Sequence, residues 1–260
     1  MIIRPLNSSI KACFRAVVTT LVAVAVPVST AQATTVSPVM VDLQTAGRGV
    51  VANISVNNTG AAPLPVEIVV TPLRATAAGF APATGDVDDL LVVPPTALIP
   101  AGQTQTFRVQ WIGDPNLTDS KHYYIGVNQV PVKLPEGTSA VQVVYNFQVL
   151  TSVASPGEHP DLVLHSAAPV AGADGKVAAV ISVENKGGAH GYLSQHRLRI
   201  SETDKAGKEI FSRTISGSEF QQLIGYGLIA SHSTRSVTLP LDLPSPNGAV
   251  TALLLDQQAQ

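Results

Sequence analysis

Cysteine is almost absent from this sequence. The 260 residues contain only Cys13, which lies just ahead of an apolar segment near the N-terminus. After residue 33 the chain therefore has no thiol nucleophile and no possible disulfide, so its fold must depend on ordinary hydrophobic cores. Because Cys13 follows Lys11 and precedes the apolar run, its position is not that of a lipid-attachment cysteine.

Catalytic signatures are missing as well. The sequence has no Gly-x-Ser-x-Gly elbow and no glycine-rich phosphate loop. No two histidines have the i,i+2 or i,i+4 spacing that would place two metal ligands on one face of a strand or helix. The histidines are His122, His159, His165, His190, His196 and His232. A metal site built across loops from His190 and His196 is one interpretation, and surface or turn histidines are the other. The sequence predicts a protein that is not an enzyme and has no metal, cofactor or small-molecule substrate.

Charge is scarce and nearly balanced. Charged residues make up 13% of the chain, with 16 basic and 18 acidic side chains. The first 33 residues hold three of the basic and none of the acidic ones, which leaves 13 against 18 in the remainder. No basic cluster suggests a nucleic-acid surface. The neighbouring acids Asp86, Asp88 and Asp89 have no other ligand type beside them, which is typical of a solvated loop.

Residues 1–33 have the pattern of a secretory signal peptide. Arg4, Lys11 and Arg15 precede an apolar run over 16–28, and small residues ending in an Ala-x-Ala site follow. A single membrane anchor is the alternative, but the run is short and contains Pro27. We expect export with cleavage after about Ala33, and a mature chain that does not span a membrane.

The remaining sequence is rich in short β-branched runs and lacks helical periodicity. Gly, Pro, Asn and Ser clusters separate these runs, as in all-β sandwiches. Predicted strands in the first half cover residues 38–43, 50–57, 65–73, 104–111, 123–132 and 141–150. The Ala-, Gly- and Asp-rich segment 74–89 is predicted to be a loop.

The stretch VQVVYNFQVL, residues 141–150, alternates clearly. Its odd positions are all apolar or aromatic, whereas Gln142, Asn146 and Gln148 are amides. Alternation places successive side chains on opposite faces, so it predicts a strand. Val144 and Leu150 interrupt the polar face, and both faces can therefore contact apolar groups.

An internal repeat suggests two similar domains. Residues 54–60, ISVNNTG, return as ISVENKG at 181–187, with five of seven positions identical. Each copy is a β-branched strand that ends in an Asn/Gly turn. A break around 154–160 lies between them, and 227 residues suffice for two domains of about 100 residues each. The expected division is 34–154, a linker at 155–159, and 160–260.

The stretch VPPTALIPAGQTQTFRV, residues 93–109, resembles the periplasmic chaperones of chaperone–usher pilus assembly. The double proline, the Pro-x-Gly turn and the Arg-Val strand carry most of the resemblance. Residues 36–43, 51–60 and 120–131 are similar to further strands of the first domain in that family. The resemblance implies an all-β fold of two immunoglobulin-like sandwich domains, arranged at an angle with a cleft between them. It also implies a periplasmic location.

The resemblance further implies a mechanism in which the seventh strand, about residues 140–153, is lent to an incomplete pilus subunit. An outer-membrane usher then replaces the chaperone. The residues expected to fill the subunit's groove are Val141, Val143, Tyr145, Phe147 and Val149. The alternative is that this odd face packs into the chaperone's own core, and a bulge could instead expose Val144 or Leu150.

One feature departs from the family pattern. Members hold the subunit's terminal carboxylate with two basic residues, and the matching positions here are Met40 and Leu150. This suits the archaic, or alternative, branch of the family. Candidate replacements are Arg108, whose guanidinium can bind a carboxylate bidentately, and Lys121. Lys133 is a further basic residue in this region.

Other functions are compatible with parts of the sequence. A secreted structural or adhesive sandwich, such as a pilus component, would have the same strand pattern. Such a subunit should have a donor tail and one incomplete domain, and this chain shows neither. A metal- or carbohydrate-binding sandwich would need clustered ligands or exposed aromatics, and the chain has a single tryptophan, Trp111.

Overall fold

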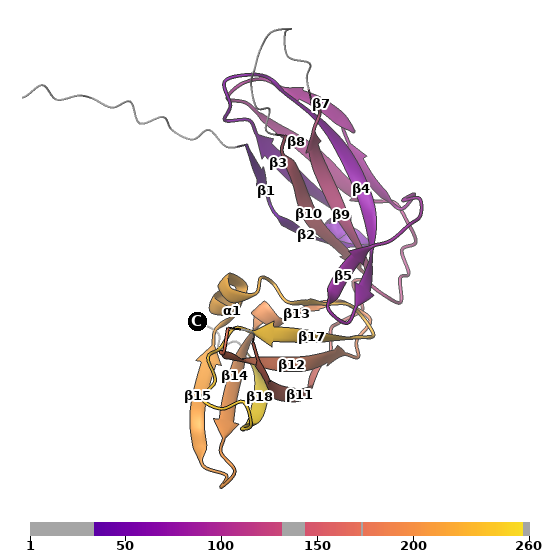
Figure 1. The fold of residues 1–260 in the computed structure, drawn as a ribbon. Coiled ribbons are helices and arrows are strands. Elements are labelled where there is room, and N and C mark those ends of the chain that lie inside the picture. Colours follow the sequence, from indigo (N-terminus) through magenta and orange to yellow (C-terminus); the bar gives the residue numbers. More distant parts are fainter. Residues whose placement is uncertain (1–33, 132–143, 173, 257–260) are drawn as a thin grey trace, which may run out of the picture. The chain divides into compact units, whose positions relative to one another are not determined.

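The computed structural model describes residues 34–131, 144–172 and 174–256. This part of the chain consists mainly of β-strands (Figure 1), which confirms the all-β prediction. The predicted signal peptide, Lys133, Val141 and Val143 lie outside the described residues. None of the helices in the described ranges is long and apolar enough to cross a membrane.

The first half of the chain forms a sandwich of two sheets. One sheet has the order β1-β3-β8-β6 and the other has β2-β10-β9-β4-β5, with β7 paired to β4. A short 3-10 helix, η1 (Gly47–Val50), precedes β3. The strands are β1 (Thr35–Ser37), β2 (Met40–Gln44), β3 (Val51–Asn57), β4 (Leu64–Thr76), β5 (Gly79–Pro82), β6 (Leu90–Val93), β7 (Thr96–Ile99), β8 (Thr104–Trp111), β9 (Lys121–Gln129) and β10 (Asn146–Ala154).

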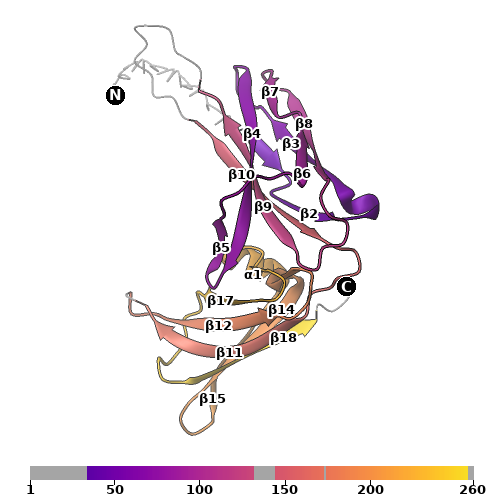
Figure 2. The same ribbon diagram turned by 90° about the vertical axis from the view of Figure 1, so that its right-hand side faces the viewer.

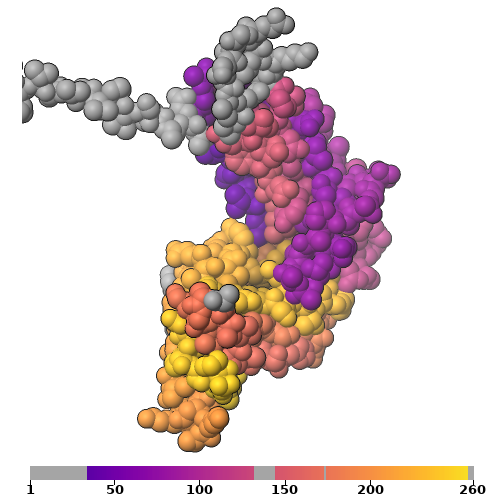
Figure 3. Space-filling view, in the orientation of Figure 1, coloured from indigo at the N-terminus to yellow at the C-terminus, as the bar shows by residue number. Residues whose placement is uncertain are grey.

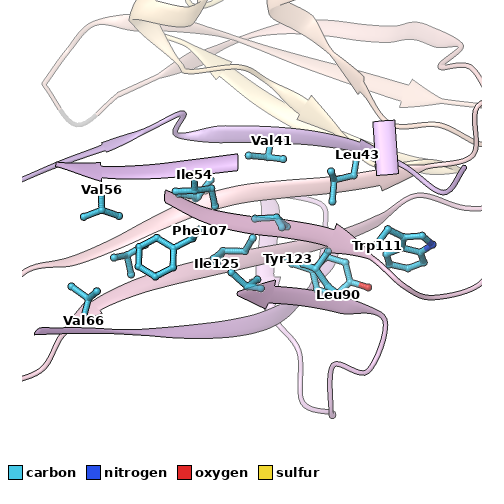
Figure 4. Packing of buried hydrophobic residues seen from close by; sticks show 14 of the residues in the cluster. Val41, Leu43, Ile54, Val56, Val66, Leu90, Phe107, Trp111, Tyr123 and Ile125 are labelled. Atoms are coloured by element: carbon cyan, nitrogen blue, oxygen red, sulfur yellow. The ribbon is translucent and has the colours of Figure 1, made fainter. Parts of the chain in front are cut away.

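Alternating side chains of both sheets fill the space between them (Figure 4). Phe107, Ile54 and Ile125 are fully buried there, and Trp111 and Tyr123 lie towards one end of the cluster. Burial of one such large apolar side chain contributes about 1.5–3 kcal/mol to folding. This cluster is the core that a chain without disulfides requires.

The second half forms another sandwich with its own core. Its sheets have the orders β11-β12-β17 and β15-β14-β18, and β13 pairs with β16. The elements are β11 (Leu162–Ala171), β12 (Val177–Asn185), β13 (Gly191–Tyr192), η2 (Leu193–Gln195), β14 (His196–Thr203), β15 (Glu209–Ile215), α1 (Gly217–Leu223), β16 (Leu228–Ile229), β17 (Ser233–Leu239) and β18 (Ala249–Asp256). The core residues of the two sandwiches form separate clusters. The proposed domain boundaries and linker stay predictions.

The repeated sequence has the same structural role in both sandwiches. Asn58 and Asn185, 127 positions apart, are almost fully buried at the ends of β3 and β12. Asn58 Nδ2 donates to the carbonyl of Ala62 at 2.8 Å, and Asn185 Nδ2 donates to that of Ala189 at the same distance. Each side-chain oxygen also accepts the N–H of the glycine two residues later. The repeat therefore marks an asparagine that organises the turn after a core strand.

The prediction of a loop over 74–89 is wrong for its first part. Strand β4 continues to Thr76 and turns back into β5 (Figure 2). In this hairpin Leu73 pairs with Pro82. The Ala77 carbonyl accepts the N–H of Ser236 at 2.9 Å. Alanine, glycine and threonine give little local strand signal, and pairing with distant residues decides the conformation here.

Candidate partner-binding edge

Strand β10 has a neighbour on both sides for only part of its length. It pairs with β9 in antiparallel fashion from Asn146 to Val153, and with β2 in parallel from Leu150 to Ala154. Figure 2 shows β9 and β10 side by side. Residues 146–149 thus have a partner strand on the β9 side only, and we call their other side the open edge.

Backbone polar groups of β10 face this open edge. The N–H of Leu150 donates to the Val39 carbonyl at 3.1 Å, on the β2 side. The Tyr145 carbonyl accepts from Gln129 N–H at 2.9 Å, on the β9 side. Because backbone directions alternate along a strand, the N–H and C=O groups of Asn146 and Gln148 point to the open edge. Over the ranges that the structure describes, no strand pairs with them there.

The odd-numbered side chains of residues 145–149 change from exposed to buried along the chain. Tyr145 is 40% exposed, Phe147 is half-buried, and Val149 is 1% exposed in the core of the sandwich. The rings of Tyr145 and Phe147 are stacked, with centroids 6.1 Å apart. Val149 was expected to fill a partner's groove, but its side chain is fully used in this protein's own core.

Tyr145 and Phe147 lie at an apolar opening at the end of the sandwich. They line a narrow crevice, too small for a water molecule, together with Thr34, Val56, Leu64, Val66, Val127 and Gln129. Figure 3 shows pink atoms of β9 and β10 at the surface, beside the purple atoms of β4. Tyr145 and Phe147 thus cover one end of the apolar core, beside unpaired backbone groups to which a partner's strand could add.

The outer face of the same sheet is apolar at positions 40 and 150, where the family pattern has basic residues. Leu150 lies beside Met40 on β2 and beside Tyr124 on β9. All three side chains are half-buried. The structure therefore places Met40 and Leu150 next to each other, and this row of three contains no cation.

The two basic candidates lie elsewhere. Arg108 is exposed on the other sheet, opposite Asn53 and Val93. Lys121 lies opposite Val153, at the far end of β10. Its ammonium contacts Asp89 Oδ2 at 2.5 Å and lies 5.6 Å from the Trp111 ring centroid. Neither side chain is brought to residues 146–149.

Sequence reasoning missed Arg235, on β17. Its Nη1 donates to the Leu228 carbonyl at 2.8 Å, and its buried Nε has no partner among the described residues. Burial lowers the pKa of Arg235, and the charge interaction with Tyr124 opposes that shift. The only signal in the sequence is an arginine within a segment, 220–241, that has no acidic residue.

A polar cluster joins the two sandwiches beside β2, β9 and β10. Asp42 Oδ1 accepts from the Tyr192 hydroxyl at 2.6 Å and lies 3.2 Å from His190 Nε2. The other nitrogen of that ring, Nδ1, lies 3.0 Å from Ser120 Oγ. His122 Nδ1 lies 2.9 Å from Ser152 Oγ. The ring centroids of His122 and His190 are 5.4 Å apart.

Burial and hydrogen bonding set the protonation of this cluster. Burial, with a smaller effect from His190, lowers the pKa of His122 from 6.5 to about 3. Burial acts to raise the pKa of Asp42, but the hydrogen bonds from His190 and Tyr192 outweigh it and lower that pKa. Burial and the Asp42 charge raise the pKa of Tyr192. The cluster therefore favours a neutral His122 and an ionised Asp42 at neutral pH.

The histidines considered as metal ligands are separated. His190 contacts Asp42 and Ser120, whereas His196 begins β14 opposite Asp256. Within residues 34–131, 144–172 and 174–256, no three His, Cys, Asp or Glu side chains are grouped to hold a metal ion.

Known structures share this fold. The class 5 fimbriae chaperone CfaA is similar with a TM-score of 0.53 and 13% identity, over 88% of this chain and 94% of that one. A chain from the chaperone–tip adhesin complex of CFA/I fimbriae biogenesis has a TM-score of 0.52 and 12% identity, with the same coverage. At these identities the similarity shows the fold alone. No curated protein sequence matches the chain.

A sequence family matches the first sandwich. Residues 33–150 match the family described as pili and flagellar-assembly chaperone, PapD N-terminal domain. Its members are assembly chaperones and not enzymes, which confirms the prediction of a non-enzymatic protein. The first sandwich, over residues 33–150, therefore belongs to the family of pili and flagellar-assembly chaperones.

Proposed function

We propose that this protein is a periplasmic chaperone that lends the open edge of β10 to an incomplete pilus subunit. The observation that carries the proposal is the change in β10 at Leu150, where β2 pairing ends and unpaired backbone groups begin. Tyr145 and Phe147 lie on the same segment at the end of the apolar core, and Tyr145 is 40% exposed. An extended strand of a partner would add to the sheet there.

The two recognition elements have different roles. Backbone hydrogen bonds to Asn146 and Gln148 would each contribute about 0.5–1.5 kcal/mol net, with little dependence on the partner's sequence. Burial of the exposed part of Tyr145 and of the Phe147 ring would add on the order of a few kcal/mol and select for an apolar groove. We leave Val149 out of this proposal because its side chain is only 1% exposed, and Val141 and Val143 stay predictions.

The second proposed partner is an outer-membrane usher that receives the subunit. The usher, the periplasmic location and the archaic branch are implied by the family resemblance. One similar structure is a complex of a chaperone with a tip adhesin, which supports a subunit as the first partner. A secreted structural or adhesive protein is the alternative, and it would not release a captured sandwich subunit.

For the subunit's terminal carboxylate we propose Arg235 ahead of Arg108 and Lys121. Arg235 lies near enough to Tyr124, the β9 neighbour of Leu150, for that group to influence its pKa, and it has no acidic partner among the described residues. Arg108 lies on the other sheet and Lys121 is held by Asp89. Alanine variants of all three residues separate these candidates, because only loss of the anchor should weaken binding of a subunit with an intact C-terminus and spare one that is amidated.

The proposed function is tested by capture of a pilin whose sandwich lacks its last strand. The change is Tyr145→Arg, which places a charge at the open edge. Leu98→Arg is the matched control, since Leu98 is 67% exposed on β7 of the same sandwich. We expect Tyr145→Arg to abolish capture and Leu98→Arg to retain it. Equal capture by the wild type and Tyr145→Arg would contradict the proposal.

A further inference from the structure

The strand that limits the open edge is short and poorly supported by its own sheet. Strand β2 has five residues and pairs only with β10, in parallel, along Leu150 to Ala154. Parallel pairing is slightly weaker per residue than antiparallel pairing, and an edge strand can fray or slip. Where β2 begins decides how much of β10 stays open.

Among the described residues, the side-chain hydrogen bonds from the second sandwich to β2 all end on Asp42. Asp42 is at the middle of β2, opposite Ser152 of β10. Both atoms that reach Asp42 Oδ1, the Tyr192 hydroxyl and His190 Nε2, come from the second sandwich. Hydrogen bonds to an ionised carboxylate are roughly twice as strong as neutral ones.

His190 also reaches the other side of β10. Its Nδ1 lies 3.0 Å from Ser120 Oγ, and its backbone N–H donates to the same oxygen at 2.8 Å. Ser120 directly precedes β9, and its own N–H contacts Ser231 Oγ at 3.0 Å. Asp42 on β2 and Ser120 beside β9 are therefore joined through one imidazole, and β10 lies between those two strands.

His122 lies at the centre of this arrangement. Its imidazole contacts Ser152 of β10 and packs against the rings of Phe80 and His190, with centroids 4.7 and 5.4 Å away. His122 is only 5% exposed. The three adjacent strands β2, β10 and β9 thus each contribute one side chain, Asp42, Ser152 and His122, to the contact with the second sandwich.

We propose that Tyr192 and His190 are positioning residues which clamp β2 onto β10 through Asp42 and so fix where the open edge begins. The consequence for subunit capture rests on the proposed function, whereas the clamp itself does not. The clamp gives the second sandwich a part in strand donation, although the donated strand belongs to the first sandwich. Without the clamp, β2 would separate from residues 150–154 or shift along the edge.

The clamp is tested by amide hydrogen exchange in the free protein. The variants are Tyr192→Phe, Asp42→Asn and their combination. Ser201→Ala is the matched control, because it removes a hydroxyl contact of 2.8 Å to Thr251 that lies within the second sandwich. We expect exchange at Leu150 and Ser152, whose N–H groups face β2, to rise roughly ten- to hundredfold.

In the double variant, these amides should exchange at about the rate seen in the faster of the two single variants, because both changes break the same contact. Core amides of the second sandwich, such as Val183 and Ile200, should keep their wild-type rates. Unchanged exchange at Leu150 and Ser152 would overturn the clamp, and so would an equal rise at Val183 and Ile200, which would indicate general loosening.

Pilin capture by the same variants separates the clamp from the proposed function. Faster exchange together with weaker capture supports both. If wild-type protein captures no pilin while exchange still rises in the variants, the clamp stands and the proposed function fails.

Discussion

Acidic pH should lower the free energy of unfolding of this protein through His122. Burial lowers the pKa of His122 from 6.5 to about 3, so the folded protein keeps this imidazole neutral over a range in which the unfolded chain protonates it. The stabilising effect is fully present above pH 6.5. It declines as the pH falls below 6.5 and is lost once the pH passes the folded pKa near 3.

The magnitude at pH 5 follows from these values. An unfolded pKa of 6.5 and a folded value well below 5 give a loss of about 2 kcal/mol between pH 7 and pH 5. This figure depends mainly on the unfolded pKa, because the folded group is still neutral at pH 5. Against a typical stability of about 5–15 kcal/mol, a loss of 2 kcal/mol is readily measured.

The assay is urea unfolding of wild type and His122→Asn at both pH values. Asparagine can retain the hydrogen bond to Ser152 Oγ but does not titrate. We expect the wild type to lose about 2 kcal/mol more than His122→Asn between pH 7 and pH 5. His159→Asn, at an exposed site, is the control and should behave like the wild type. Equal losses in wild type and His122→Asn would show that His122 does not cause the acid destabilisation.

Two further predictions concern the sandwiches themselves. Asn58→Ala and Asn185→Ala should each lower the free energy of unfolding by about 1–3 kcal/mol, because each leaves buried carbonyl and N–H groups without a partner. Denaturant titration measures this loss. An unchanged free energy of unfolding at either site would contradict the equivalence of the two turns. Ser216→Ala should cost about 0.5–2 kcal/mol, since the Ser216 side chain caps α1 by accepting from the Glu219 N–H; a thermal midpoint equal to that of the wild type would argue against the cap.

The regular strands could be predicted because their cores leave a local pattern. The sequence predicts a strand over residues 104–111, and β8 has the same bounds, with Phe107, Val109 and Trp111 alternating inwards. The hairpin of β4 and β5 could not be predicted, since its small residues owe their conformation to pairing with distant strands.

The candidate site was predictable only in part. The alternation of residues 141–150 predicts a strand in which all odd-numbered side chains share one environment. The structure instead exposes Tyr145 and buries Val149. That difference arises because β2 covers β10 only from Leu150 onwards. The contact between Asp42 and Tyr192 joins residues 150 positions apart and has no local signature.

The central claim is that the open edge of β10 pairs with a strand of the partner. The most direct test is amide hydrogen exchange of Asn146 and Gln148 in the free protein and in its complex with a pilin that lacks one strand. We expect fast exchange of both amides in the free protein and strong protection in the complex, since their N–H groups face the open edge. Equally fast exchange of both amides in the complex would contradict it.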